Sequence, residues 1–93
     1  MASSPDRALV YILRCGDNSL YIGETDDVAA RVARHNEGTA SVFTAVRRPV
    51  TLVYCETHTY RLTALRRERQ LKRWTRAKKE ALIARDLTRL KHL

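Results

Sequence analysis

The sequence has no long apolar run, few cysteines and no low-complexity segment, and each absence narrows the class of protein. No stretch approaches the ~20 consecutive apolar residues of a membrane-spanning helix. Residues 1–6 lack the charged start and apolar core of a signal peptide, so we expect a cytoplasmic protein. The 2 cysteines, Cys15 and Cys55, have no metal-ligand spacing and indicate free thiols in a reducing compartment.

The length of 93 residues suffices for one domain and is too short for two. A chain of this size can bury roughly 60–65% of its unfolded surface, which allows one modest core. Its apolar content of 44% suits a globular protein. Without repeats or a linker, we expect a single domain over residues 1–93, with its core at about 8–83.

The positive charge is concentrated in the last third of the chain. Residues 1–60 contain 6 Lys/Arg and 7 Asp/Glu, a net charge of −1, whereas residues 61–93 contain 12 against 3, a net charge of +9. This distribution favours a polyanionic partner such as nucleic acid, bound in a salt-dependent way. A solvated helical face, or a helix on a membrane surface, would give the same bias.

Apolar spacing and turn residues predict the element order ββαβαα. Strands are expected over residues 9–14, 20–24 and 50–56, the first two forming a hairpin around a turn at 16–19. A helix should run from a cap at Thr25 or Asp26 to about Asn36, with Gly38 as its stop, followed by basic helices over 61–74 and 75–90. Residues 39–49 should form a loop and residues 1–6 a loose tail. The fold class is α/β (α+β), a compact domain with a short sheet.

Several side chains could support chemistry, although each has an ordinary structural explanation. Tyr11 and Tyr21 lie on the two hairpin strands, where half-buried tyrosines are common. Arg31 and His35 are four residues apart and share one helix face, at the edge of its apolar stripe. Gly23 could relieve crowding in its strand or let another backbone approach.

Glu68 falls in the middle of the apolar face of its helix, with Ala64 and Leu71 on one side of it and Leu65 on the other. Burying an unpaired carboxylate is costly, so a neutralising partner is expected. A cation such as Mg²⁺, which prefers carboxylate oxygen, would satisfy this requirement. An ion pair with Arg31 or another arginine would satisfy it equally.

Taken together, these residues resemble the GIY-YIG nuclease family. The matching segments are VYIL at 10–13, YIG at 21–23, DVAARVARHN at 27–36 and ALRRE at 64–68. The ending RAKKEALI at 76–83 is similar to the small stand-alone bacterial members. The resemblance implies a small three-stranded antiparallel sheet flanked by helices, and endonuclease activity that depends on one divalent cation, Mg²⁺ or Mn²⁺.

The same resemblance implies a role for each candidate residue. Tyr11 would be the general base or the group that orients water, and Tyr21 would hold the water network or the scissile phosphate. Arg31 would bind the phosphate, His35 matches the helix histidine of many members, and Glu68 would be the metal ligand. A phenol has a pKa near ~10, so Tyr11 could act as a base only with help from the cation, Arg31 or a relay through His35.

The sequence departs from the family pattern in three places. Val10 replaces the glycine before the first tyrosine, and no asparagine follows Asn36, so Lys72 or solvent would replace the later asparagine of some relatives. We expect no appended DNA-binding domain of the kind that targets some relatives, so the basic helices, the loop with Arg47 and Arg48, and Trp74 would have to hold the substrate. Trp74 would stack on an unpaired base or anchor two helices in the core. Residues expected to bind nucleic acid are Arg34, Arg47, Arg48, Lys72, Arg73, Arg76, Lys78 and Lys79.

A domain this small can contact only a few base pairs or a short strand. We therefore expect a DNA endonuclease that acts on single-stranded, branched or damaged DNA, with single-stranded DNA as the preferred substrate. The simplest organisation is a monomer that cuts one strand, associated with the nucleoid in a bacterial cytoplasm. Two alternatives remain open: a nucleic-acid-binding module with little catalytic activity, and a protein-interaction adaptor in a DNA repair complex.

Overall fold

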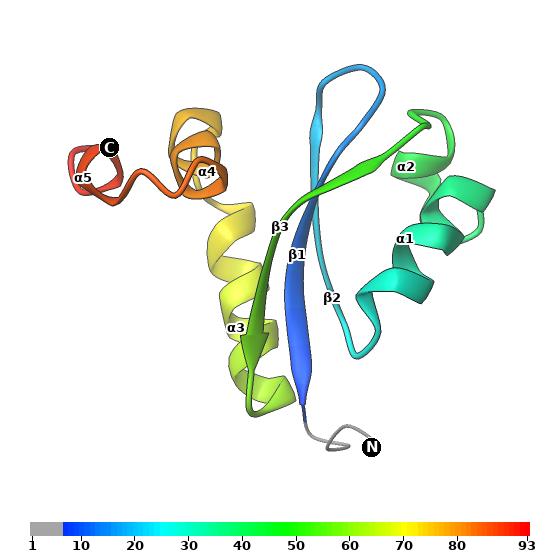
Figure 1. Cartoon of the computed structure of the whole chain (residues 1–93), viewed down its shortest axis with the longest axis horizontal. Coiled ribbons are helices and arrows are strands. Elements are labelled where there is room, and N and C mark those ends of the chain that lie inside the picture. Colours follow the sequence, from blue (N-terminus) through cyan, green and yellow to red (C-terminus); the bar gives the residue numbers. More distant parts are fainter. Residues whose placement is uncertain (1–6) are drawn as a thin grey trace.

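A computed structural model of the chain describes residues 7–93; the tail expected at residues 1–6 lies outside this range. The centre is a three-stranded antiparallel sheet in the order β2-β1-β3 (Figure 1), built from β1 (Ala8–Arg14), β2 (Leu20–Thr25) and β3 (Thr51–His58). Helices flank the sheet, which confirms the predicted α+β fold. The predicted order ββαβαα is also confirmed, with two short helices added to it.

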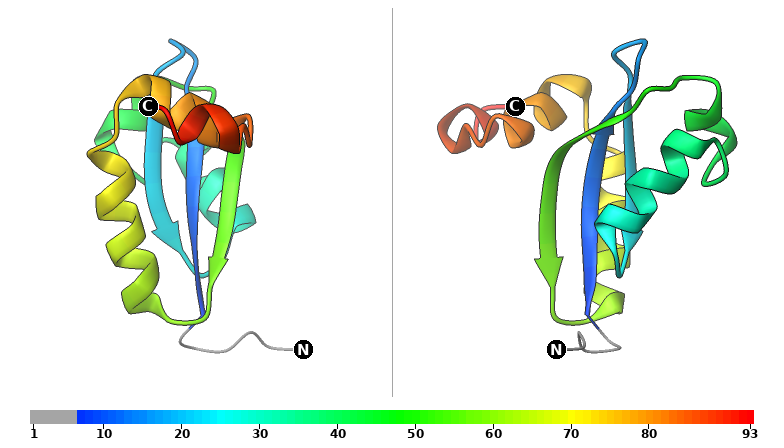
Figure 2. Two further views of the ribbon diagram at one scale, coloured as in Figure 1. Left: turned by 90° about the vertical axis from the view of Figure 1, so that its left-hand side faces the viewer. Right: turned by 45° about the vertical axis from the view of Figure 1, so that its right-hand side comes forward.

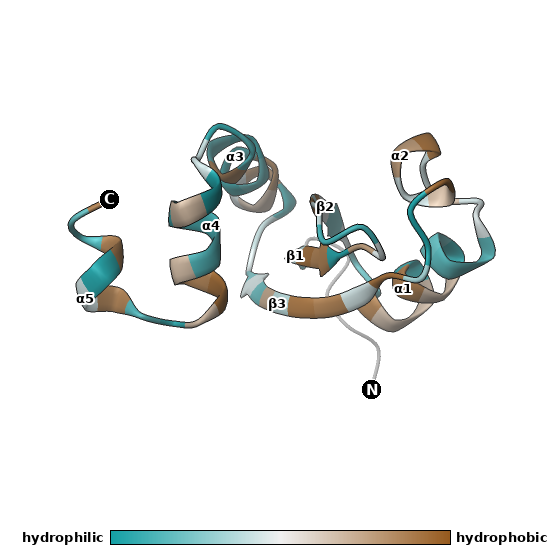
Figure 3. Cartoon of the chain, turned by 90° about the horizontal axis from the view of Figure 1, so that it is seen from above, coloured by the Kyte–Doolittle hydropathy of each residue, from teal (hydrophilic) through white to brown (hydrophobic). Residues whose placement is uncertain are grey.

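The helices lie on opposite sides of the sheet (Figures 1 and 2). Helices α1 (Val28–Glu37) and α2 (Val42–Ala45) lie on one side, and α3 (Arg61–Lys72) and α4 (Arg76–Ile83) on the other. The view from above shows the apolar β1 between the two groups (Figure 3). Helix α5 (Leu87–Leu90) packs next to α4 at the outer end. No helix within residues 7–93 is long and apolar enough to cross a membrane.

Strand β1 is buried on both faces because it is the central strand. Val10 and Ile12 point toward α3 and pack with Ala64 and Leu71. The intervening side chains, Tyr11 among them, point to the opposite face, where Val28 and Val32 of α1 cover them. Strand alternation therefore sends the Tyr11 phenol to the α1 side of the sheet.

Two expectations about the helices were wrong. Residues 39–49 are not simply a loop, because they contain α2, whose first turn is capped by the Ser41 side chain. The helix expected over residues 75–90 is interrupted after Ile83. Arg85 adopts a left-handed conformation with φ 56°, and Asp86 then caps α5 by accepting a hydrogen bond from the Arg89 amide. A residue such as Asp86, which favours helix starts, was the available signal for this break.

An ion pair fixes α4 to the end of the central strand. The Arg14 guanidinium donates to both carboxylate oxygens of Glu80, at 2.7 and 2.8 Å, and Arg76 donates to the same carboxylate at 2.9 Å. Hydrogen bonding from Arg14 lowers the pKa of Glu80 to about 2. This contact holds the first turns of α4, including Lys79, beside the hairpin.

Candidate active site

Gly23 allows the Tyr11 ring to lie across strand β2. The two residues are directly paired in the antiparallel register. A Cβ atom at position 23 would meet the Tyr11 hydroxyl oxygen at 2.4 Å and its Cζ at 2.5 Å, distances that no real side chain tolerates. The glycine therefore makes room for a phenol; of the two roles suggested by the sequence, this agrees with relief of crowding in the strand and not with the approach of another backbone. Because β2 is an edge strand, the Tyr11 hydroxyl reaches the rim of the sheet.

His35 is fully buried and is held through both ring nitrogens. Its Nε2 lies 2.9 Å from the Tyr11 hydroxyl and its Nδ1 lies 2.7 Å from Thr44 Oγ1. His35, Tyr11 and Thr44 each have 0% exposure. Burial lowers the pKa of His35, and the nearby charges of Arg31 and Arg34 lower it further. The imidazole is therefore neutral at pH 7, in the interior rather than at the boundary position expected from the helix wheel.

The other predicted site residues act on the Tyr11 phenol, through its pKa or through packing. Burial raises the pKa of Tyr11 to about 12; charge on Tyr21 and Glu68 acts in the same direction, while the Arg31 guanidinium opposes the rise. The Tyr21 ring also packs edge-on against His35, with 4.9 Å between ring centroids. Tyr11, Tyr21 and His35 thus pack together, while Arg31 on α1 and Glu68 on α3 lie near enough to influence the pKa of Tyr11.

Glu68 lies on α3, and its side chain remains partly accessible. Its carboxylate is 3.5 Å from the Lys72 ammonium, one turn further along the helix, and its side chain is 20% exposed. Its ion-pair partner is therefore a lysine on its own helix and not Arg31. Within residues 7–93 no cluster of three or more His, Cys, Asp or Glu side chains could hold a metal by itself. Any cation here would have one protein carboxylate and otherwise water or substrate oxygens.

A pocket continues from Tyr21 along the edge of β2. Its volume is about 220 Å³. Leu20, Ile22 and Phe43 give it apolar walls, and Lys72 and Lys79 bring two ammonium groups from α3 and α4. The Phe43 ring lies near Tyr21, at 6.1 Å between centroids, and Arg47 covers it with its guanidinium carbon 3.8 Å from the centroid. The pocket thus combines an apolar floor with cationic edges.

The basic residues expected to bind nucleic acid do not form one surface. Lys72 and Lys79 line the pocket beside Tyr21, while Arg73 and Lys78 lie around Trp74. Arg48 has a structural contact, since it donates to the backbone oxygens of Ala45 and Asn36. Arg47 pairs with Asp17 and also covers Phe43 at the pocket beside Tyr21. Arg76 pairs with Glu80, and Arg34 lies exposed on α1.

Residues 7–81 match the family model for the GIY-YIG catalytic domain. The chain belongs to the GIY-YIG family. UPF0213 proteins of Staphylococcus epidermidis and Staphylococcus aureus are 49% and 50% identical to it over 78 residues, which cover 84% of this chain and 95% of each relative. The solution NMR structure of a UPF0213 protein from Bacillus halodurans is 37% identical, with a TM-score of 0.56 over 84% of this chain and 83% of that one.

GIY-YIG membership implies an activity of the nuclease type and suggests DNA binding. The relatives are bacterial, as the sequence suggested, and their names give neither substrate nor metal. The resemblance inferred from the tyrosine segments is confirmed over most of the chain.

Sequence reasoning missed the contribution of α2 to this GIY-YIG site. Thr44 holds the buried imidazole, and Phe43, 38% exposed, forms a wall of the pocket beside Tyr21. Helix α2 has only four residues, too few for a periodic apolar pattern. The available signal was Ser41, a residue favoured at helix starts, which hydrogen-bonds the Thr44 amide at 3.1 Å.

Proposed function

We propose that this GIY-YIG chain is a metal-dependent endonuclease that hydrolyses phosphodiester bonds in DNA, with single-stranded DNA as its preferred substrate. The observation that carries the proposal is the convergence around one phenol of an arginine, a neutral buried histidine and a partly exposed carboxylate. Phosphodiester hydrolysis needs a path for the proton of water and positive charge against the phosphate. This arrangement offers groups for both.

Tyr11 and His35 form a proton relay in this proposal. The Thr44 hydroxyl can donate to the Ser41 carbonyl oxygen, at 3.4 Å, and accept from Nδ1–H of His35. The Nε2 lone pair then accepts the Tyr11 hydroxyl proton. Because the pKa of Tyr11 is raised to about 12, Tyr11 does not ionise beforehand. Its oxygen accepts the proton of the attacking water while its own proton moves to Nε2.

The relay accounts for the proton that the attacking water loses. The water oxygen forms a bond to phosphorus as the bond to the leaving oxygen breaks, and His35 holds the proton that water has lost. The imidazolium returns this proton to solvent or to the leaving oxygen after cleavage. Arg31 faces the non-bridging oxygens, where its guanidinium opposes the charge gained in the transition state. Tyr21 positions the phosphate or its water against these groups.

Glu68 fits the role of a ligand for Mg²⁺ or Mn²⁺. Mg²⁺ keeps several waters and is commonly bound through one or two carboxylates together with substrate phosphate oxygens. A single carboxylate that is 20% exposed and close to Tyr11 suits that mode better than a closed cage of protein ligands. When bound, the divalent cation supplies positive charge against the scissile phosphate. Lys72, beside Glu68, adds a second cationic group at the same place.

The pocket beside Tyr21 supports a preference for unpaired strands. Its apolar walls suit the flat face of a base that is not stacked in a duplex, and Lys72 and Lys79 suit the flanking phosphates. Branched and damaged DNA expose unpaired nucleotides and are the next expected substrates. An intact duplex presents its bases stacked and paired, so it must be opened at an energetic cost.

A cleavage assay with labelled DNA tests this proposal. Single-stranded, branched and duplex substrates of the same sequence are incubated with Mg²⁺, Mn²⁺ or EDTA. We expect metal-dependent products, formed fastest from the single strand and absent in EDTA. An Arg31→Ala variant, which loses the phosphate contact, should lower the rate by about 10²–10³-fold.

Two results would replace the proposal with an alternative. Salt-sensitive binding of DNA without products under any condition would indicate a nucleic-acid-binding module. Neither cleavage nor DNA binding, with stoichiometric binding of a repair protein in the absence of DNA, would indicate an adaptor. A rate with Arg31→Ala equal to the wild-type rate would place the reaction elsewhere on the protein.

A further inference from the structure

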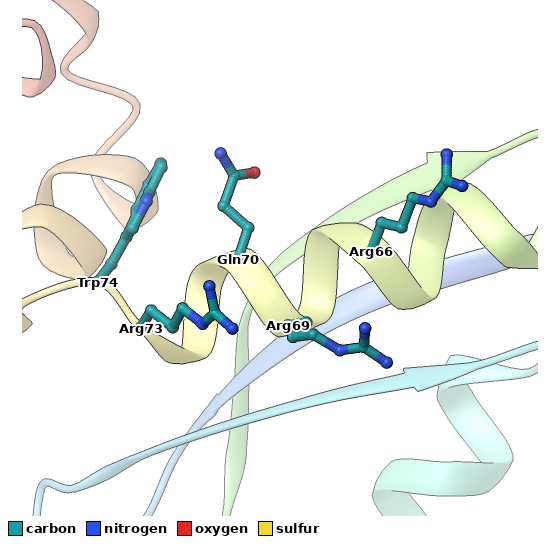
Figure 4. A pocket seen from close by; sticks show the side chains of 5 residues that line it. All are labelled: Arg66, Arg69, Gln70, Arg73 and Trp74. Atoms are coloured by element: carbon teal, nitrogen blue, oxygen red, sulfur yellow. The ribbon is translucent and has the colours of Figure 1, made fainter.

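The outer side of α3 carries a second basic pocket, separate from the one beside Tyr21. Its volume is about 330 Å³. Its lining consists of Arg66, Arg69, Gln70, Arg73 and Trp74 (Figure 4). On a helix with about 100° per residue, Arg66 and Gln70 point roughly 160° away from Glu68. The pocket therefore faces away from the candidate active site, although one helix carries both.

The three arginines of this pocket have no acidic partners. Within residues 7–93, none of Arg66, Arg69 and Arg73 forms an ion pair, and all three are exposed. The other basic residues of α3 differ in this respect: Arg61, Arg67 and Lys72 pair with Glu24, Glu56 and Glu68. The unpaired charge of α3 is thus concentrated in one pocket.

Trp74 closes the pocket at the junction of α3 and α4. Part of the indole packs against the core, as the sequence suggested, and the remainder lines the pocket (Figure 4). Two cations lie against its ring, with the Arg67 guanidinium carbon at 5.2 Å and the Lys78 nitrogen at 4.9 Å from the centroid. A ligand group that contacts the exposed part of the Trp74 ring therefore lies close to these two cations.

We propose that this Trp74 pocket is a second nucleic-acid site, which binds a single strand beyond the segment held at the candidate active site. Arginine forks suit phosphate oxygens, while the indole and the Gln70 amide suit a base. A peptide of Asp and Glu residues would use the arginines but has no aromatic ring to stack on Trp74. This inference rests on the proposed function, because the active-site strand is what brings DNA to α3.

The spacing of the arginines fits a strand that runs along the helix. From Arg66 to Arg73 the helix rises about 10 Å. One strand of stacked DNA carries a charge every ~3.4 Å, so this length corresponds to about three phosphates. The second site would make affinity depend on strand length, because a short strand cannot reach from the active site to the outer side of α3.

Binding of labelled oligothymidylate tests the proposal in the Tyr11→Phe background, where the strand is not cut. The variant combines Arg66→Gln, Arg69→Gln and Arg73→Gln. The control combines Arg7→Gln, Arg89→Gln and Lys91→Gln, which removes the same charge from exposed residues elsewhere. Relative to the control, we expect at least tenfold weaker binding of a 20-nucleotide strand. The slope of log K against log salt should fall by about 2, since each phosphate contact contributes ~0.7 on single strands.

The length series separates a second site from weakening of the first. For a 4-nucleotide strand the pocket variant should bind as the control does. Equal binding of the 20-nucleotide strand by variant and control would overturn the proposal, as would arginine-dependent binding of polyglutamate as tight as that of the strand. Absence of cleavage by the wild-type protein would instead overturn the proposed function, and it leaves this binding comparison intact.

Discussion

The two halves of the candidate site differ in how strongly burial and hydrogen bonds fix their side chains in the absence of substrate. On the α1 side, Tyr11, His35 and Thr44 are fully buried, and hydrogen bonds of 2.7 and 2.9 Å join them. On the α3 side, the Glu68 and Lys72 side chains are 20% and 54% exposed and pair only at 3.5 Å. The groups proposed to move a proton are thus preorganised, whereas the groups proposed to contact the phosphate and the cation remain accessible to solvent.

Because of this difference, the two halves should respond differently to ionic strength and to pH. Salt screens exposed charges strongly and buried hydrogen bonds hardly at all. Raising the ionic strength should therefore weaken substrate binding, mainly through Lys72, Lys79 and the Trp74 pocket, and leave the relay unchanged. In the relay, pH is the relevant variable, because His35 must be neutral to accept a proton.

The largest effect is expected on the α3 side, from Glu68→Gln. Loss of the single carboxylate removes the expected cation site, so cleavage should fall on the order of 10³-fold. DNA binding should stay intact or tighten, because a negative charge near phosphate is removed. The measurement is single-turnover cleavage together with binding anisotropy. Glu37→Gln, which removes an exposed carboxylate from α1, is the matched control.

A different outcome for Glu68 would favour the ion-pair interpretation. If Glu68→Gln unfolds the protein while its folded fraction still cuts at the wild-type rate, then Glu68 serves stability through Lys72 and binds no catalytic cation. Thermal melting, measured beside the cleavage assay, separates these two cases.

On the preorganised side, Gly23→Ala should be almost as damaging. The new Cβ would lie 2.4 Å from the Tyr11 hydroxyl oxygen, so the ring must leave its place beside His35. We expect about 10²-fold slower cleavage and a loss of about 1–3 kcal/mol in the free energy of unfolding. Tyr11→Ala removes the clashing atoms. In a protein that already carries Tyr11→Ala, Gly23→Ala should therefore lower the free energy of unfolding only slightly further. If Gly23→Ala lowers it equally in both backgrounds, the strain arises elsewhere.

Sequence predicted the groups that sit on regular elements. Tyr11, Tyr21, Arg31 and His35 follow from strand alternation and from the four-residue spacing on a helix, and Glu68 from its place on an apolar face. Their convergence could be inferred only through the family resemblance, because contacts between β1, α1 and α3 are tertiary. The reason for Gly23 was equally hidden, since the neighbouring phenol lies on another strand.

The parts that were missed depend on short elements. Helix α2 has four residues and gives no periodic pattern, so Thr44 and Phe43 had no visible role. The break between α4 and α5 occurs at Ala84 and Arg85, without glycine or proline to indicate it. Burial of His35 likewise follows from α2 covering α1 and not from the helix wheel.

Thr44→Val tests whether the histidine must be held in one tautomer. Valine keeps the approximate volume but removes the acceptor for Nδ1–H, which should cost about 1–3 kcal/mol in unfolding free energy. With the proton free to move to Nε2, we expect roughly tenfold slower cleavage. Thr44→Ser keeps the hydroxyl and should restore most of the rate. If Thr44→Ser restores the stability but not the cleavage rate, the hydroxyl has no part in the relay.

The pH profile of the wild-type protein follows from the same histidine. Burial lowers the pKa of His35, so its neutral form persists to lower pH than that of an ordinary histidine near ~6.5. The rate should therefore be independent of pH around neutrality and should fall only below the pKa of an ordinary histidine, ~6.5. Measurement of kcat/KM between pH 4.5 and 8 checks this expectation. A fall centred above ~6.5 would contradict the assignment of a neutral, buried imidazole.

The smallest effect is expected for Glu80→Gln, in the exposed ion pair that holds α4. The pKa of Glu80 is lowered to about 2 when folded, from 4.5. The pair therefore stabilises the fold above pH ~4.5 and loses this effect as the pH falls toward 2. With solvent screening, we expect a loss of about 1 kcal/mol or less at pH 7. Urea unfolding at pH 7 and pH 2.5 measures it, and a difference that persists in full at the lower pH would exclude the ion pair as its origin.

The central claim is that the phenol beside Gly23 takes part in the chemistry, and a matched pair of tyrosine substitutions tests it most directly. Tyr11→Phe removes the hydroxyl that contacts His35, whereas Tyr54→Phe removes a hydroxyl that contacts Glu56 on the other face of the sheet. With metal ion and labelled single-stranded DNA, Tyr11→Phe should cleave about 10³-fold more slowly while still binding DNA, which is the middle of the range for loss of acid–base catalysis. Tyr54→Phe should cleave at close to the wild-type rate. Equal rates for the two folded variants would contradict the account.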